Sequence, residues 1–237
     1  MANTWDIIGL AVKFLPYFQG QGTEAPEAEI STKDMALLSV RQKPGSVTVI
    51  VGTRDTGKST MAYRYCEFLG RKTYAVSPEE RPPSWVERIK LEEVFDCVKP
   101  HSTLVCDDLP AYASNRDYNN NLIAALEKMI PMVRHERELH LVFCTQSSAQ
   151  ADKYILDCDM AFFKPLGLLF EDLERPGITK LYKKYVNPEF DGRSENWIKR
   201  HAYMFSRTYK GLITVSKPAY TKSTAVIDGV TVETEIL

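Results

Sequence analysis

Apolar residues along the chain gather in short runs, and these runs alternate with stretches of helical spacing. A β-branched run at 47–51 precedes a helix-compatible segment from Ser59 to Leu69, which ends at Gly70. Further strand-like runs lie at 72–77, 102–110, 139–148 and 160–167. Strands that alternate with helices predict a mainly parallel sheet flanked by helices on both faces. Wholly apolar strands fit that arrangement, because both of their faces are buried.

The two ends of the chain differ from its central part. An apolar stretch at 7–15 is interrupted by Lys13 and closed by Pro16, so it is shorter than the ~20 residues that a spanning helix needs. It also lacks the pattern of a signal peptide. We expect residues 1–30 to form an amphipathic helix and an acidic linker, the helix docking on its own domain, a neighbouring subunit or a membrane surface. The main domain is then predicted over 31–218. A C-terminal tail is predicted over 219–237, with a hairpin as one option for its structure.

The segment after the first apolar run carries the clearest chemical motif. Its spacing, Gly52-x-x-x-x-Gly57-Lys58-Ser59, is that of a phosphate-binding loop between a strand and a helix. Glycines let the backbone approach the phosphates, and the helix directs its positive end at them. Lys58 would bridge the β- and γ-phosphates of ATP, and the Ser59 hydroxyl would bind Mg²⁺. The predicted nucleotide-binding residues are Gly52, Thr53, Arg54, Asp55, Thr56, Gly57, Lys58, Ser59 and Thr60.

An acid inside this loop, Asp55, is electrostatically unexpected beside phosphates. We expect it to serve the backbone, since Asp tolerates the left-handed conformation better than most residues. Two later strands also end in polar residues. Asp107 and Asp108 follow one of them, where Asp107 would hold Mg²⁺ and Asp108 would polarise the attacking water. Gln146 follows the next, where its amide would contact the γ-phosphate or the water.

Composition changes this interpretation little, but charge distribution adds to it. The 237 residues carry a net charge of −1, which excludes a polycation. Between Arg175 and Lys222, however, eleven Lys or Arg face only three acids, an excess that permits nucleic-acid contact but also fits a solvated surface. The five cysteines form no CxxC pair, and no zinc spacing occurs among cysteines and histidines, so we expect reduced thiols in an intracellular protein.

The motifs "GTRDTGKST", "TLVCDD" and "RHERELHLVFCTQSS" together resemble the HerA/FtsK superfamily of ring-forming, DNA-pumping ATPases. The small size of the chain and the early position of its first motif are most similar to the genome-packaging ATPases of tailless icosahedral viruses with internal membranes. Two departures are Asp55, where the family usually has a further glycine, and an Asp-Asp pair in place of Asp-Glu. The resemblance implies an α/β fold of the P-loop NTPase type (RecA-like). It also implies an arginine that reaches the nucleotide of the next subunit, for which Arg134 and Arg137 are candidates, Arg134 preferred.

The resemblance further implies a function and its setting. The expected protein is an ATPase that packages a viral double-stranded DNA genome into a preformed capsid, with ATP and Mg²⁺ as cofactors. It would act as a homo-oligomeric ring, a hexamer or pentamer, in the host cytoplasm and at the virion, with a capsid vertex or internal membrane as further partners. Contacts with DNA would be to the backbone, because no base-reading motif is present. The alternatives are a virion assembly or extrusion ATPase of the same superfamily, a P-loop kinase of a small metabolite, and a non-catalytic nucleotide switch.

Overall fold

A computed structural model of the chain describes residues 32–76, 82–107, 137–146, 158–167, 176–215, 222–227 and 230–235. The strands are β1 (Ser46–Val51), β2 (Thr73–Val76), β3 (Val86–Arg88), β4 (Thr103–Cys106), β5 (His140–Thr145), β6 (Met160–Phe163), β7 (His201–Ser206), β8 (Lys210–Thr214), β9 (Lys222–Ile227) and β10 (Val230–Glu235). The helices and helical turns are α2 (Thr32–Arg41), α3 (Lys58–Leu69), η1 (Leu91–Glu93), α4 (Val94–Cys97), α8 (Pro176–Leu181), the π-helical η4 (Tyr182–Val186), α9 (Asn187–Phe190) and α10 (Glu195–Lys199).

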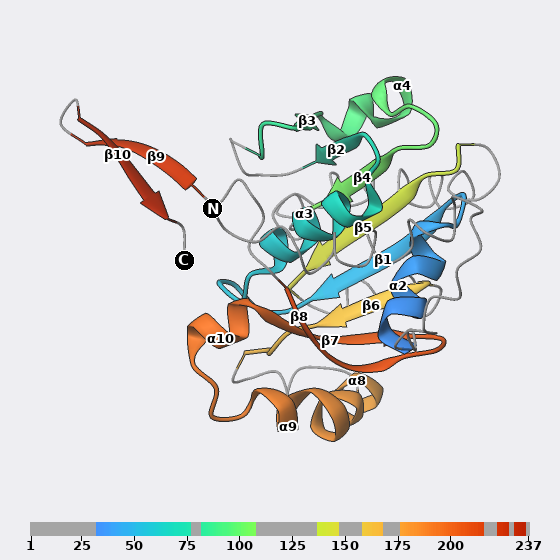
Figure 1. Cartoon of the computed structure of the whole chain (residues 1–237), viewed down its shortest axis with the longest axis vertical. Helices are drawn as coiled ribbons and strands as arrows, with labels where there is room; N and C mark the ends of the chain where they lie inside the picture. The colour runs from blue at the N-terminus through green and yellow to red at the C-terminus, as the bar shows by residue number, and fades with distance from the viewer. Residues whose placement is uncertain are drawn as a thin grey trace, which may run out of the picture.

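The centre of the molecule is an eight-stranded sheet in the order β3-β2-β4-β5-β1-β6-β7-β8 (Figure 1). The six strands from β3 to β6 run parallel, and β7 and β8 continue the sheet in antiparallel pairings. Strands β9 and β10 form a separate two-stranded antiparallel sheet. Because β5 lies between β1 and β4, segments far apart in the sequence meet at the carboxyl ends of these three strands.

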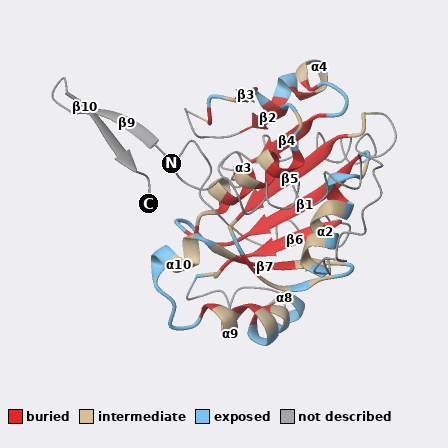
Figure 2. Cartoon of the chain, in the orientation of Figure 1, coloured by how far each residue is buried: buried red, intermediate tan, exposed pale blue. Residues whose placement is uncertain are grey.

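Helices cover both faces of this sheet. Neighbouring residues of a strand point to opposite faces, so Val49 of β1 enters one hydrophobic cluster and Ile50 enters the other. The Val49 cluster includes residues of α4, η4 and α9, whereas the Ile50 cluster includes residues of α2 and α3. Figure 2 shows the central strands buried and the outer sides of the helices exposed. The predicted fold class is therefore confirmed.

Strand ends depart from the sequence-based ranges by a few residues. The run at 102–110 contributes only Thr103–Cys106 to β4, and the run at 160–167 contributes Met160–Phe163 to β6, with the following residues in the loops at the carboxyl edge. Helix α3 begins at Lys58, one residue earlier than expected, and ends at Leu69, where it is capped by Gly70 in a left-handed conformation. The antiparallel strands β7 and β8 have no counterpart in the sequence analysis, because the partly exposed positions of β8 mix Lys, Gly and Thr with its apolar residues.

The cysteines and the helices are relevant to disulfide bridges and to membrane spans. All five cysteines are free, and three of them, Cys66, Cys106 and Cys144, are buried. None of the helices in the described part of the chain has both the length and the apolar character needed to cross a bilayer. The predicted N-terminal helix at 1–30 lies outside the described residues.

Candidate nucleotide-binding site

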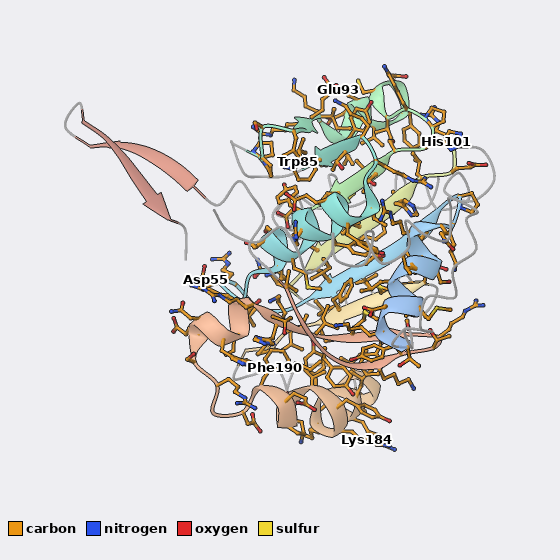
Figure 3. The ribbon with its side chains drawn as sticks, viewed as in Figure 1. Asp55, Trp85, Glu93, His101, Lys184 and Phe190 are labelled. Carbon is orange, nitrogen blue, oxygen red and sulfur yellow. The ribbon has the colours of Figure 1, made fainter. Side chains whose placement is uncertain are left out.

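The loop between β1 and α3 is the candidate phosphate-binding loop. Asp55 lies at φ 59° and Gly57 at φ 81°, so two residues of the loop are left-handed. The expectation that Asp55 serves the backbone agrees with this, since Asp adopts the left-handed region at a lower cost than most residues with a Cβ. Its side chain is exposed, and Figure 3 shows Asp55 at the surface of the molecule.

Both motif glycines are closely packed, Gly52 against Lys164 and Gly57 against Lys199. A Cβ on Gly52 would meet the Cβ of Lys164 at 2.8 Å, and a Cβ on Gly57 would meet the carbonyl oxygen of Lys199 at 2.9 Å. The loop is also hydrogen-bonded to its neighbours in the sheet: the Gly52 amide donates to the Thr145 carbonyl at 3.2 Å. Glycine is needed at these two places because the loop is packed too closely for a side chain.

Lys58, the first residue of α3, lies across the loop that precedes it. Its ammonium donates to the Thr53 carbonyl at 2.7 Å, and the Thr56 hydroxyl donates to the same oxygen at 2.7 Å. The residue is only 8% exposed. Ser59 and Thr60 follow in the first turn of α3, which is the positive end of the helix. Both residues are half-buried.

The strand order brings the other predicted residues to the same edge. Asp107 directly follows β4 and is 2% exposed, and Gln146 directly follows β5, which separates β4 from β1. Parallel strands end at one edge of a sheet, which is where ligands of such folds bind. The phosphate loop, Gln146 and Asp107 therefore follow three adjacent strands in that order.

Cys144, which the sequence analysis did not single out as a site residue, lies among these groups. Burial, and after it the nearby Asp107 carboxylate, raise the pKa of the Cys144 thiol well above its ordinary value, while Lys58 acts in the opposite direction. The thiol is hydrogen-bonded to Asp107. These influences show that Lys58, Asp107 and Cys144 share one buried polar environment between α3 and the ends of β4 and β5.

The arginine candidates are placed differently. Arg137 precedes β5 at the amino edge of the sheet, opposite the phosphate loop of its own chain, and its guanidinium donates to the Val98 carbonyl at 2.7 Å. Arg134 and Asp108 lie outside the described residues. The structure therefore brings together the loop, Lys58, Ser59, Asp107 and Gln146, and it does not bring Arg137 to them.

A second residue that the sequence analysis did not single out is Lys164, directly after β6. Its side chain is fully buried, and burial, with the charge of Lys58 as a smaller cause, lowers its pKa to about 7. The available signal was the sequence "MAFFKP", in which a lysine ends a wholly apolar strand beside the strand of the phosphate loop.

Comparison with known proteins gives structural likeness only. No protein-family model and no curated protein matches the chain. The cytoplasmic domain of the type VII secretion ATPase EccC of Thermomonospora curvata aligns with 73% of this chain and 24% of its own, at 12% identity and a TM-score of 0.45. The chain thus spans about a quarter of that EccC chain.

Two further solved structures are matched over most of their own length. A protein named simply as an ATPase aligns with 74% of this chain and 80% of its own, at 12% identity and a TM-score of 0.45. The KaiC-like protein PH0186 of Pyrococcus horikoshii OT3 aligns with 80% of this chain and 90% of its own, at 13% identity and a TM-score of 0.43. Function is inferred below from the residues of this chain.

Proposed function

We propose that the chain binds ATP with Mg²⁺ and hydrolyses it. The observation that carries the proposal is the arrangement at the carboxyl edge, where the loop before Lys58, Gln146 and Asp107 follow the adjacent strands β1, β5 and β4. The residues fit the cofactors. The packing around Gly52 and Gly57 leaves no room for a side chain on either residue. The Ser59 hydroxyl and the Asp107 carboxylate are oxygen ligands of the kind that Mg²⁺ prefers.

Each residue has a role in this chemistry. The loop amides and Lys58 bind the phosphates, and Ser59 and Asp107 hold the metal, which neutralises charge on the phosphates when bound. Gln146 orients the water or reports the γ-phosphate. Asp108, the next residue of the chain after Asp107, polarises the attacking water.

We further propose that hydrolysis drives translocation of double-stranded DNA in a homo-oligomeric ring, a hexamer or pentamer, that packages a viral genome into a preformed capsid. An arginine from the next subunit would complete each site. Because Arg137 is bound to Val98 of its own chain, Arg134 is the preferred finger. A capsid vertex or an internal membrane would be the docking partner, at work in the host cytoplasm and on the virion.

The charge of the described C-terminal segment supports a DNA partner. From 176 to 215 there are eight Lys or Arg and three acids, an excess of five positive charges. Lys183 and Lys184 are exposed on η4, and Figure 3 shows Lys184 directed away from the body of the molecule. Side chains of this kind contact phosphates without reading bases.

One assay separates the proposal from its rivals. ATP hydrolysis by the purified chain is measured with and without long linear duplex DNA, and a rise on adding DNA is expected. Phosphate transfer to a nucleoside with no response to DNA would instead favour a metabolite kinase. The kinase alternative also needs a lid rich in arginine. The segment 81–90 carries Arg81 and Arg88 and is the candidate for it, but Val86–Arg88 belong to the sheet as β3 beside β2.

A second assay locates the DNA-binding surface. Replacing Lys183 and Lys184 by Gln should weaken binding to all duplex sequences alike. It should also make the salt dependence of affinity shallower, by roughly 0.9 in log–log slope for each phosphate that the variant no longer neutralises. The matched control is replacement by Gln of Lys33 and Lys90, two lysines outside the basic C-terminal segment. A slope unchanged in the first variant would remove η4 from the DNA-binding surface.

A further inference from the structure

Lys164 is a buried cation at the edge of the candidate site. It directly follows β6, and its amide donates to the Val51 carbonyl at 2.8 Å, so its backbone prolongs the pairing of β6 with β1 to the start of the phosphate loop. Its side chain is fully buried. A buried ammonium is costly unless its donors are satisfied, so its contacts define what it does.

The ammonium of Lys164 donates three hydrogen bonds to backbone carbonyls. The acceptors are Ile198 at 3.1 Å, Lys199 at 3.1 Å and His201 at 2.9 Å. An ammonium has three donors, so all of them are used. The acceptors belong to the end of α10 and the first residue of β7, where helix carbonyls otherwise have no intrahelical partner. Lys164 therefore fixes the α10–β7 turn to the end of β6.

The same turn is the surface against which the phosphate loop packs. The Lys199 carbonyl oxygen that Lys164 binds is the atom that a Cβ on Gly57 would meet at 2.9 Å. On the other side, Gly52 lies against the Lys164 Cβ, and the Thr53 amide donates to the Pro165 carbonyl at 3.1 Å. Residues 164–165 and 198–201 thus form one wall of the loop, joined by the ammonium.

We propose that Lys164 is a positioning residue of the nucleotide site, which holds the α10–β7 turn so that Gly57, and with it the amides at the start of α3, keep their place. The inference rests on the proposed ATP binding. Lys164 itself touches no reacting atom, because its three donors are taken by the turn. A methionine of similar length would preserve the packing of the stem and lose all three hydrogen bonds.

The test compares Lys164→Met with a matched control, Lys43→Met. Lys43 also anchors backbone, since its ammonium binds Asp159, whose carboxylate accepts the Val47 amide at 2.9 Å at the opposite edge of the sheet. For Lys164→Met we expect the Kd and KM for Mg-ATP to rise about tenfold or more, because a misplaced loop amide loses its hydrogen bond to a charged phosphate, and one such bond corresponds to about tenfold in affinity. For Lys43→Met we expect a lower melting temperature with Kd and KM within about twofold of the original chain.

The split between KM and kcat separates positioning from plain destabilisation. A variant that only lost folded molecules would show a lower apparent kcat and an unchanged KM. Folded Lys164→Met protein with an unchanged KM and Kd would therefore overturn the inference while leaving the proposed function intact. If the original chain neither bound nor hydrolysed ATP, the proposed function would fail first, and the role of Lys164 would fall with it.

A measurement on the original chain decides the matter if Lys164→Met does not fold. Hydrogen exchange is followed with and without Mg²⁺ and a slowly hydrolysed ATP analogue. We expect slower exchange in the loop at 52–59 and also in the turn at 198–202, with no change at 43–48. Protection of the loop without protection of the turn would show that the turn is not part of the nucleotide site.

Discussion

Polar groups are buried both at the amino edge of the central sheet, where the parallel strands begin, and at its carboxyl edge, where they end. Their interactions at the two edges differ. At the amino edge, Lys43 and Asp159 form an ion pair, and the Ser46 hydroxyl lies 2.5 Å from His140 Nδ1. Arg71 there donates to the carbonyls of Lys43, Pro44 and Glu138. At the carboxyl edge, Lys58 and Lys164 bring two positive charges near each other, beside the loop that contains the left-handed residues Asp55 and Gly57.

The difference indicates where stability and function reside. The charges at the amino edge attract one another or bind backbone, so they hold β1, β5 and the helix ends together. The carboxyl edge keeps two like charges near each other, an arrangement that persists where the surroundings enforce it and that is typical of binding sites. Substitutions at the amino edge should therefore change stability, and those at the carboxyl edge should change nucleotide chemistry.

The largest effect is expected from Lys58→Ala. Loss of the charge that we propose acts on the phosphates should lower ATP hydrolysis by about 10²–10³-fold or more. The melting temperature should hardly change, because the substitution also removes the repulsion that helps to lower the pKa of Lys164. Steady-state hydrolysis and thermal unfolding check this together. A folded variant with full turnover would contradict the central claim about this edge.

The next effect concerns the metal. Asp107→Asn keeps the shape of the buried side chain and removes its charge, so we expect Mg²⁺-dependent ATP binding to weaken about tenfold or more. Binding in the presence of a chelator should be unchanged. Asp108→Asn should instead retain Mg-ATP binding and hydrolyse slowly. Nucleotide titrations with and without Mg²⁺ distinguish the two, and equal loss of affinity in both variants would contradict the division of roles.

Much of this carboxyl edge was predictable from the sequence, and the reason is local. The glycine spacing, Lys58 and the acid after an apolar strand are contiguous patterns, and strands alternating with helices indicate which ends of the strands share an edge. The positions of Lys164 and Cys144 depend on contacts between distant segments. Lys164 binds carbonyls 34 to 37 residues away, and Cys144 meets Asp107 only because β5 lies beside β4. No spacing rule contains that information.

The amino edge was not predicted for the same reason. Ser46 and His140 are 94 residues apart in sequence, and a lone histidine at the start of an apolar run carries no pattern. The strands β7 and β8 were missed because β8, the outermost strand of the sheet, is only partly buried. It therefore lacks the continuous apolar character of the central strands. Sequence patterns thus indicated the chemistry of one edge and left out the interactions that stabilise the other.

A substitution at the amino edge should show the converse of Lys58→Ala. Asp159→Ala removes the acceptor of the Val47 amide and the partner of Lys43, at a cost of about 3 kcal/mol in the free energy of unfolding. Asp159→Asn keeps an acceptor for the amide and should cost less. Chemical denaturation measures both. The KM for ATP should stay within about twofold at temperatures where the variants are folded, and a KM that rose in step with the lost stability would break the separation between the edges.

The smallest effect is a pH dependence from the same edge. Burial, followed by the charge of Arg71, lowers the pKa of His140 to about 4, and Asp159 opposes them only weakly. In the unfolded chain the histidine has an ordinary pKa near 6.5, so between these values the unfolded state binds a proton that the folded state does not. Stability from this group is therefore complete above about pH 6.5 and falls as the pH drops toward 4, by up to about 1.4 kcal/mol per pH unit.

A neutral replacement isolates this contribution. His140→Gln has no charge to gain, so its free energy of unfolding should change less between about pH 6.5 and 4 than that of the original chain, even if its stability at neutral pH is lower. Denaturation at a series of pH values measures both slopes. Nucleotide affinity should be the same for the two proteins across this range wherever both are folded, because His140 lies at the edge opposite the phosphate loop. Parallel slopes in the two proteins would show that the acid sensitivity arises elsewhere and that the buried histidine contributes none of it.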